Sequence, residues 1–263
     1  MPRLISFRLL AACALALVVS LAPAAGAVAK APKGATAELR VVGKGGKVLT
    51  EETLQPGTTT IKTSPKANCF GSGTAGSGKS VTIKGPTALG LLGQASKSNP
   101  ALRPLLITDA FDFGLGICGV GTSKVSGKAS WYLKVNHKGA SVSGDAVKLK
   151  AGDEVLWDLA PSYPYPNELA LVAPERVESG VPFEVRVYSY DEKGKRKPVA
   201  GAKIAGIGGV AAAVSDGEGR ATITLTADVP QYETLQATHG KEIPSAAEPV
   251  YLCVAGACIQ TTK

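Results

Sequence analysis

Hydrophobic and polar residues alternate in several short segments of the first half of the chain. Each segment is bounded by Gly, Pro or Asn, a pattern typical of β-strands with one buried face. In one of them Trp131, Leu133 and Val135 share a face, and Tyr132 and Lys134 fall on the other. The pattern predicts strands at residues 37–43, 58–63, 80–85, 129–136 and 154–159.

One segment between these strands has a helical pattern instead. Residues 86–92 (PTALGLL) begin with Pro and Thr and then place apolar residues at helical spacing, which predicts a short helix. Strands around a single helix indicate an α+β fold for residues 37–160.

The second half carries strand patterns only. Residues 182–190, 219–226 and 248–255 alternate, and turn-forming clusters separate them. This spacing predicts a small all-β sandwich over residues 169–263. Residues 161–168 (PSYPYPNE) contain three prolines, so we expect a stiff linker between two domains there.

The first 29 residues have the layout of a secretory signal peptide. Two arginines precede an apolar run at residues 9–21, and small residues follow it, so cleavage is expected after Ala27 or Ala29. A lipobox-like context at Cys13 is the less favoured alternative, because the apolar run continues past it. We expect a secreted or extracellular protein, loosely associated with the cell wall at most, with no transmembrane segment in the mature chain.

Basic residues outnumber acidic ones, and the formal net charge is +8 at pH 7. The lysines are scattered through turns and form no stripe interleaved with aromatic residues, so no nucleic-acid partner is expected. A solvated basic surface with weak attraction to anionic cell-wall polymers is the simpler interpretation.

Four cysteines remain once Cys13 is set aside. An even number in an exported chain predicts disulfide bonds, and four cysteines allow three pairings. Each half of the chain holds two of them, so we expect the pairs Cys69–Cys118 and Cys253–Cys258.

The stretch GTAGSGKS at residues 73–80 matches the phosphate-binding P-loop pattern. No apolar strand precedes it, and residues 81–86 alternate like a strand and stop at Gly-Pro instead of opening a helix. We therefore expect a Gly/Ser loop without a nucleotide.

Catalytic and metal-binding patterns are missing as well. The two histidines, His137 and His239, fall in different predicted domains, and no nucleophile elbow occurs. Turn roles are expected for the acidic residues of DAFDFG and SDGEG, with calcium binding as the weaker alternative. The sequence predicts no enzyme activity, no catalytic residue, no metal and no cofactor.

Four segments, taken in order, resemble the transcobalamin-like C-terminal domain family of secreted and surface proteins. They are residues 87–92 (TALGLL), 116–120 (GICGV), 131–136 (WYLKVN) and 150–157 (KAGDEVLW). The resemblance implies a β-grasp domain over residues 37–160. The chain lacks the helical barrel that forms the other half of the cobalamin site in the animal members.

The second half is similar to bacterial immunoglobulin-like repeats. The similarity rests on residues 177–185 (VESGVPFEV), 198–204 (PVAGAKI) and 215–221 (SDGEGRA), whose Gly and Asp residues suit tight turns. It implies an immunoglobulin-like domain that serves as a spacer or an adhesion module.

Together these patterns predict a non-enzymatic extracellular binding or adhesion module of a bacterial cell surface. Its expected partner is a cell-wall polymer, a glycan or a surface protein, and binding of cobalamin or another small ligand is the alternative. Aromatic residues supply contact area at low entropic cost, and sites often form between domains. The candidate binding residues are Tyr132 and Lys134 on the outward strand face, His137 in the turn just beyond the strand, and the linker residues Tyr163 and Tyr165. The alternative for Tyr132 is packing in a core.

Overall fold

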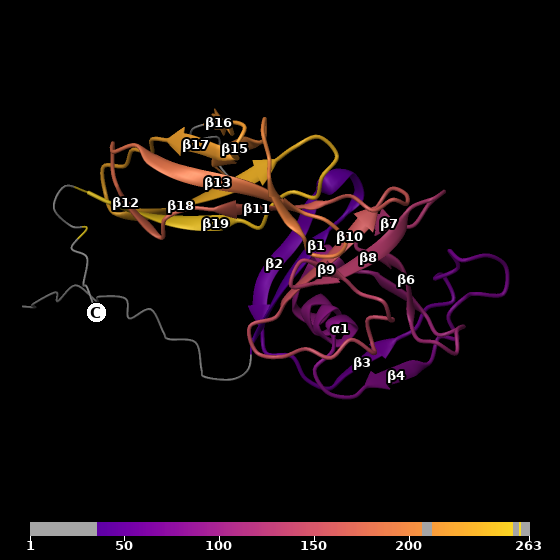
Figure 1. The fold of residues 1–263 in the computed structure, drawn as a ribbon. Helices are drawn as coiled ribbons and strands as arrows, with labels where there is room; N and C mark the ends of the chain where they lie inside the picture. Colours follow the sequence, from indigo (N-terminus) through magenta and orange to yellow (C-terminus); the bar gives the residue numbers. More distant parts are fainter. Residues whose placement is uncertain (1–35, 207–211, 255–257, 259–263) are drawn as a thin grey trace, which may run out of the picture. The chain divides into compact units, whose positions relative to one another are not determined.

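The computed structural model describes residues 36–206, 212–254 and 258 (Figure 1). The predicted signal peptide at residues 1–29 lies outside this part of the chain. The described residues belong to one compact unit and form nineteen strands, one α-helix and two short 3-10 helices. No helix among them is long and apolar enough to cross a membrane.

The N-terminal lobe (residues 37–160) is built on a five-stranded sheet with the order β2-β1-β10-β8-β9. Strands β1 and β10 are parallel neighbours, and the other pairs in this sheet are antiparallel. The bounds are Ala37–Val42 for β1, Val48–Leu54 for β2, Ser130–Val135 for β8, Lys138–Gly139 for β9 and Glu154–Ala160 for β10.

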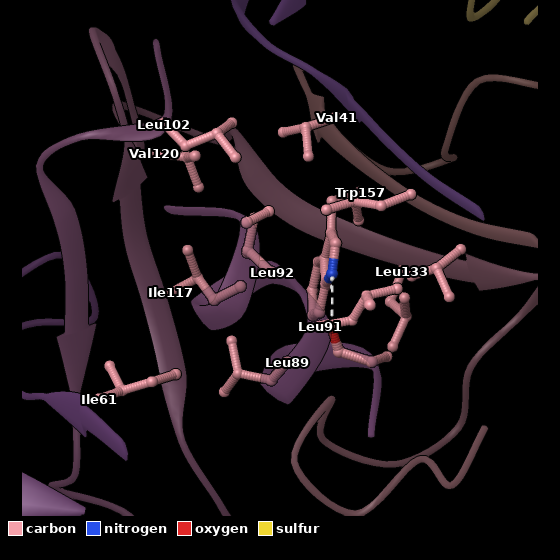
Figure 2. Packing of buried hydrophobic residues seen from close by; sticks show 14 of the residues in the cluster. Val41, Ile61, Leu89, Leu91, Leu92, Leu102, Ile117, Val120, Leu133 and Trp157 are labelled. Carbon is pink, nitrogen blue, oxygen red and sulfur yellow. Dashed lines mark hydrogen bonds between the residues drawn. The ribbon is translucent and has the colours of Figure 1, made fainter. Parts of the chain in front are cut away.

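Helix α1 (Ala88–Ser98) packs on the inner face of this sheet. Thr87 caps its first turn, since the hydroxyl accepts a hydrogen bond from the Gly90 amide at 3.0 Å. Trp157 of β10 stands over the helix and donates from Nε1 to the Ala88 carbonyl at 3.4 Å (Figure 2). The side chains that fill this core alternate along their strands, which places Leu39, Val41 and Leu133 beside the apolar face of α1.

Two small sheets cover the other side of α1. One joins β3 (Thr59–Lys62) to β4 (Ser80–Ile83), and the other has the order β5-β6-β7 (Leu105–Thr108, Gly116–Val120 and Ser123–Lys124). The glycine at position 93 of the helix lets β3 approach closely, because a Cβ there would lie 2.6 Å from Ile61 Cδ1. Ile61 and Ile117 complete the core from this side (Figure 2).

The C-terminal lobe (residues 168–253) consists of two sheets that share one core. One sheet has the order β11-β13-β14, with β17 also paired to β13, and the other has the order β12-β19-β18-β15-β16. This arrangement is compatible with an immunoglobulin-like sandwich. The bounds are Glu168–Val172 (β11), Arg176–Glu178 (β12), Phe183–Tyr190 (β13), Arg196–Pro198 (β14), Lys203–Gly206 (β15), Ala212–Val214 (β16), Arg220–Ile223 (β17), Gln231–Thr238 (β18) and Glu248–Cys253 (β19).

Both expected disulfide bonds are present. Cys69 is bonded to Cys118, which ties the loop after β3 to β6, and Cys253 is bonded to Cys258 at the end of β19. The first bond links residues 49 positions apart, and the second links residues 5 positions apart. We therefore expect the first bond to contribute more to the free energy of unfolding, because it closes the longer loop.

The α+β assignment, with its β-grasp-like first domain, is wrong. The predicted helix and all eight predicted strands are present, but eleven further strands surround them, and α1 is the only α-helix of the described residues. The added strands are short or lack clean alternation; β2, for example, has mostly half-buried positions on both faces. A single helix is therefore not enough to make the fold α+β, and the fold of the described residues is mostly β.

Candidate functional site

The outer face of the five-stranded sheet carries charged residues that are buried. Alternation turns Arg40 of β1, Lys134 of β8 and Asp158 of β10 away from the α1 core. The C-terminal lobe covers this face, and at most 9% of each of these residues is exposed. Lys134 Nζ, for example, donates to the carbonyl of Tyr190 at 3.1 Å. A charge removed from water in this way needs a partner of opposite sign.

Glu168, at the start of β11, is that partner. It is only 2% exposed and forms an ion pair and hydrogen bond with Arg40, whose guanidinium also donates to the carbonyl of Pro244. His137 Nδ1 lies 3.2 Å from Glu168 Oε1, and Lys134 Nζ lies 3.8 Å from Oε2. Burial raises the pKa of Glu168, but contact with His137 and the charges of Arg40, His137 and Lys134 together hold it below its usual value.

Asp158 occupies the same face without comparable compensation. It is 4% exposed, and its Oδ2 atom has no hydrogen-bond partner. Burial raises the pKa of Asp158 to about 7, against the opposing charges of Arg40 and Lys134. This carboxyl therefore titrates near neutral pH.

A cleft of about 750 Å³ opens beside this charged contact, between β1, β2 and β10 of one lobe and β11, β18 and β19 of the other. Most of the charged side chains that line the cleft are acidic. Six glutamates line it, whereas Arg40 and His137 are its basic lining residues. The glutamates are Glu38, Glu51, Glu52, Glu154, Glu168 and Glu248.

Three of these glutamates come from three different strands. Glu38 and Glu154 are register partners on the parallel strands β1 and β10, so their side chains share one face of the sheet. Glu248 projects from β19 of the other lobe. Burial first, and then the charges of Glu38 and Glu154, raise the pKa of Glu248. The three groups therefore repel one another when all are ionised.

His137 enters the cleft from the tight turn between β8 and β9. Asn136 and His137 both have positive φ, 51° and 66°, which is uncommon for residues other than glycine. Asp153 and the amide of Glu154 hold the Asn136 side chain by hydrogen bonds of 2.9 Å. The His137 ring stacks on Tyr190 at a centroid distance of 3.9 Å, and its Nε2 lies 3.5 Å from Glu154 Oε2. The turn thus fixes an imidazole between the two lobes.

Of the five candidate binding residues, only His137 lines this cleft. Tyr132 is 7% exposed and stacks on Tyr165 at 3.9 Å, and Lys134 is 1% exposed. The expectation that Tyr132 and Lys134 form an exposed surface is therefore wrong, because the C-terminal lobe covers the strand face that they share. Tyr163 is 75% exposed and contacts Tyr165 edge-on.

The sequence interpretation missed the glutamates altogether. They belong to strands far apart in the chain, and each reads locally as an ordinary solvent-facing position. Only the parallel pairing of β1 with β10 and the approach of β19 bring them together.

The P-loop-like stretch has the environment of a structural loop. Gly76 packs so closely that a Cβ there would lie 2.6 Å from the carbonyl oxygens of Ser64 and Ile107. The Ser77 amide and hydroxyl both donate to the carboxylate of Asp109, at 2.7 and 2.5 Å, and these bonds lower the pKa of Asp109. Strand β4 follows at Ser80, so no helix begins at the position that a P-loop requires.

The arrangement of the acidic groups also bears on metal binding. Within residues 36–206, 212–254 and 258, no three His, Cys, Asp or Glu side chains are close enough to hold a metal ion. Asp216 uses its carboxylate to accept from the amides of Glu218 and Arg220 in its own turn.

No family model matches the chain, and no curated protein and no solved structure is similar to it. The two family resemblances therefore stay predictions.

Proposed function

We propose that the protein is a secreted, non-enzymatic binding module of a bacterial cell surface that holds an extracellular ligand in the cleft between its lobes. The observation that carries the proposal is the cleft itself. Its volume of about 750 Å³ falls among those of small-ligand sites, which often form between domains with a few convergent polar groups. The two disulfide bonds favour an oxidising compartment outside the cytoplasm.

The surroundings of the histidines favour binding over catalysis. His239 Nδ1 contacts Glu242 at 2.8 Å, and Ser189 donates to the same carboxylate at 2.5 Å. The glutamate thus lies between the serine and the histidine, whereas a catalytic triad places the histidine in the middle. Ser189 is also fully buried, so a substrate has no access to its hydroxyl.

The experiment is a ligand survey of the mature protein with a blocked cleft as comparison. An array of cell-wall fragments, glycans, amines and small molecules including cobalamin is probed with the wild type and with Ala170→Trp. Ala170 lines the cleft on β11, so the indole fills the space that a ligand needs.

The matched control is Ala205→Trp, since Ala205 is an exposed alanine in β15 away from the cleft. We expect Ala170→Trp to lose the ligands that the wild type and Ala205→Trp retain, while all three proteins keep similar melting temperatures. Ligands that bind all three equally, or the absence of any ligand, would contradict the proposal.

A further inference from the structure

We propose that the ligand of this cleft is an organic cation, whose ammonium group is attracted by the carboxylates of Glu38, Glu154 and Glu248. The inference rests on the proposed function, because it specifies what the same cleft binds. The chemical class is an amine on a short hydrocarbon chain, either free or as a lysine-like side chain of a peptide.

The first step is the sign of the charge. The whole chain is basic, with a formal net charge of +8, yet six glutamates line the cleft. Of the two nitrogen-bearing residues opposite them, Arg40 is already paired with Glu168, and His137 lies between Glu154 and Glu168. A cleft that carries mostly one sign of charge between low-dielectric walls concentrates ligands of the opposite charge and repels ligands of the same charge.

The second step is hydrogen bonding. Glu168 is 2% exposed and lines the cleft, but its Oε2 atom accepts no hydrogen bond, and the nearest cation, Lys134 Nζ, is 3.8 Å away. Glu51 Oε1 is likewise buried without a partner, although Oε2 of the same residue accepts from the Ala247 amide at 2.9 Å. Buried acceptors without donors cost free energy. Both residues line the cleft, and their unpaired oxygens make its wall more negative, which favours a cation with N–H donors and no acceptor, such as an ammonium group.

The third step is the repulsion among the carboxylates. Glu38 and Glu154 lie side by side on adjacent strands, and like charges in this position destabilise a sheet. The raised pKa of Glu248 has the same origin, after burial. A bound cation screens this repulsion, which adds to the free energy of binding.

The fourth step separates an organic cation from a metal ion. Calcium needs six to eight oxygen ligands at about 2.3–2.6 Å around one ion, and no three His, Cys, Asp or Glu side chains in the described part of the chain are arranged to hold a metal ion. An ammonium group needs no such closed shell, because it can donate to one or two carboxylates and be attracted by the others at longer range. The cleft is also large and partly apolar, with Leu156, Val172 and Pro249 among its lining residues. Spread carboxylates and apolar walls suit an ammonium group carried on carbon.

Isothermal titration calorimetry of the mature wild-type protein tests the ligand class. The probes are cadaverine, the lysine analogue Nα-acetyl-lysine amide, the neutral 1,5-pentanediol, the anionic glutarate, and calcium chloride. We expect the two amines to bind, with affinities that fall as salt is added, and the other three not to bind. Tighter binding of cadaverine identifies a free amine as the source, and tighter binding of the lysine analogue identifies a peptide side chain.

Glutamine variants test the assigned carboxylates. We expect Glu38→Gln combined with Glu154→Gln to weaken amine binding at least ~10-fold, because charge-assisted hydrogen bonds are lost. The matched control Glu218→Gln, in an exposed turn, should bind as the wild type does. The double variant removes a like-charge contact, so its melting temperature should not fall, and lost binding cannot then be ascribed to unfolding.

Two different results separate failure of this inference from failure of the proposed function. If 1,5-pentanediol or glutarate binds as well as cadaverine, and Ala170→Trp abolishes that binding, the cleft is a binding site but not for cations. If the amines bind the Ala170→Trp protein as tightly as the wild type, both proposals are wrong. Equal loss in Glu218→Gln and in the double variant also overturns the assignment of the carboxylates.

Discussion

The two faces of the β1/β10/β8 sheet are both buried, but for different reasons. The inner face places Leu39, Val41 and Trp157 against α1, where they form a continuous apolar core (Figure 2). The outer face holds Arg40, Lys134 and Asp158 under the C-terminal lobe. Ion pairs to Glu168 form there beside a small apolar cluster. Alternation in the sequence separates the faces correctly, yet it does not show whether a polar face is covered.

The comparison also indicates where ligand chemistry can arise. The inner face is filled by close-packed apolar side chains, which leave no space for a ligand. On the outer face, charged side chains and a second lobe meet without filling the space between them, which leaves the acidic cleft at the edge of the ion-pair network.

The largest expected effect is on the inner face. Trp157→Ala should lower the free energy of unfolding by about 4 kcal/mol, because it removes a buried ring and leaves a cavity over α1. Urea denaturation followed by circular dichroism measures this loss. A loss below about 1 kcal/mol would show that the inner face does not dominate stability.

On the outer face, Arg40→Met should cost about 3 kcal/mol at pH 7, because Glu168 is left buried with its main partner removed. The double variant Arg40→Met with Glu168→Gln should recover most of that loss, since no uncompensated carboxylate remains. The double-mutant cycle gives the coupling energy directly. Additive losses would mean that the ion pair is not coupled, and that the face is held by its apolar contacts among Val42, Leu156 and Ile243.

Asp158 makes the stability of the outer face depend on pH, whereas the inner face is packed with apolar side chains that do not titrate. Its pKa is raised to about 7 in the folded protein, so the folded state binds more protons than the unfolded state between about pH 4 and 7. The contribution of Asp158 to stability is therefore complete below its unfolded pKa and is lost as the pH rises through 7.

Asp158→Asn removes this titration while keeping the shape of the side chain. We expect the variant to match the wild type near pH 4 and to become more stable than the wild type as the pH rises through 7. Melting temperatures across pH 4–9 measure the difference, and Trp157→Ala serves as the control because it should shift the whole profile without changing its slope. A difference between Asp158→Asn and the wild type that does not change with pH would contradict the assignment of the pKa.

The inner face of the sheet is the part of the molecule that the sequence predicts best. The strands at Leu39, Leu133 and Trp157 alternate cleanly, and Thr87 marks the start of α1. These are local signals with a fixed period. Strand β2 (VLTEETL) was missed because it has no such period, and its edge position leaves both faces half-buried.

The cleft could not be predicted, because its carboxylates meet only through tertiary structure. Glu38 and Glu154 are separated by most of the N-terminal lobe and become neighbours through one parallel pairing. The sequence predicts His137 as a candidate binding residue, but nothing in its local pattern indicates that the ring stacks on Tyr190. Burial of the Tyr132 strand face depends on the second lobe, which local alternation does not encode.

The smallest expected effect concerns the tyrosine stack at the edge of the outer face. Tyr165 packs on Tyr132 at 3.9 Å and meets Tyr163 edge-on, and aromatic pairs of this kind contribute about 1 kcal/mol beyond the area that they bury. Tyr165→Ala should therefore lower the free energy of unfolding by about 1 kcal/mol or slightly more.

Neither Tyr132 nor Tyr165 lines the acidic cleft, so cadaverine should bind Tyr165→Ala and the wild type with the same affinity. Val229→Ala, which changes a residue that is 62% exposed and lies outside the stack and the cleft, is the control and should change neither quantity measurably. If Tyr165→Ala weakens amine binding while its stability is unchanged, the stack belongs to the binding site, and the division between a covered structural face and an acidic cleft at its edge has to be redrawn.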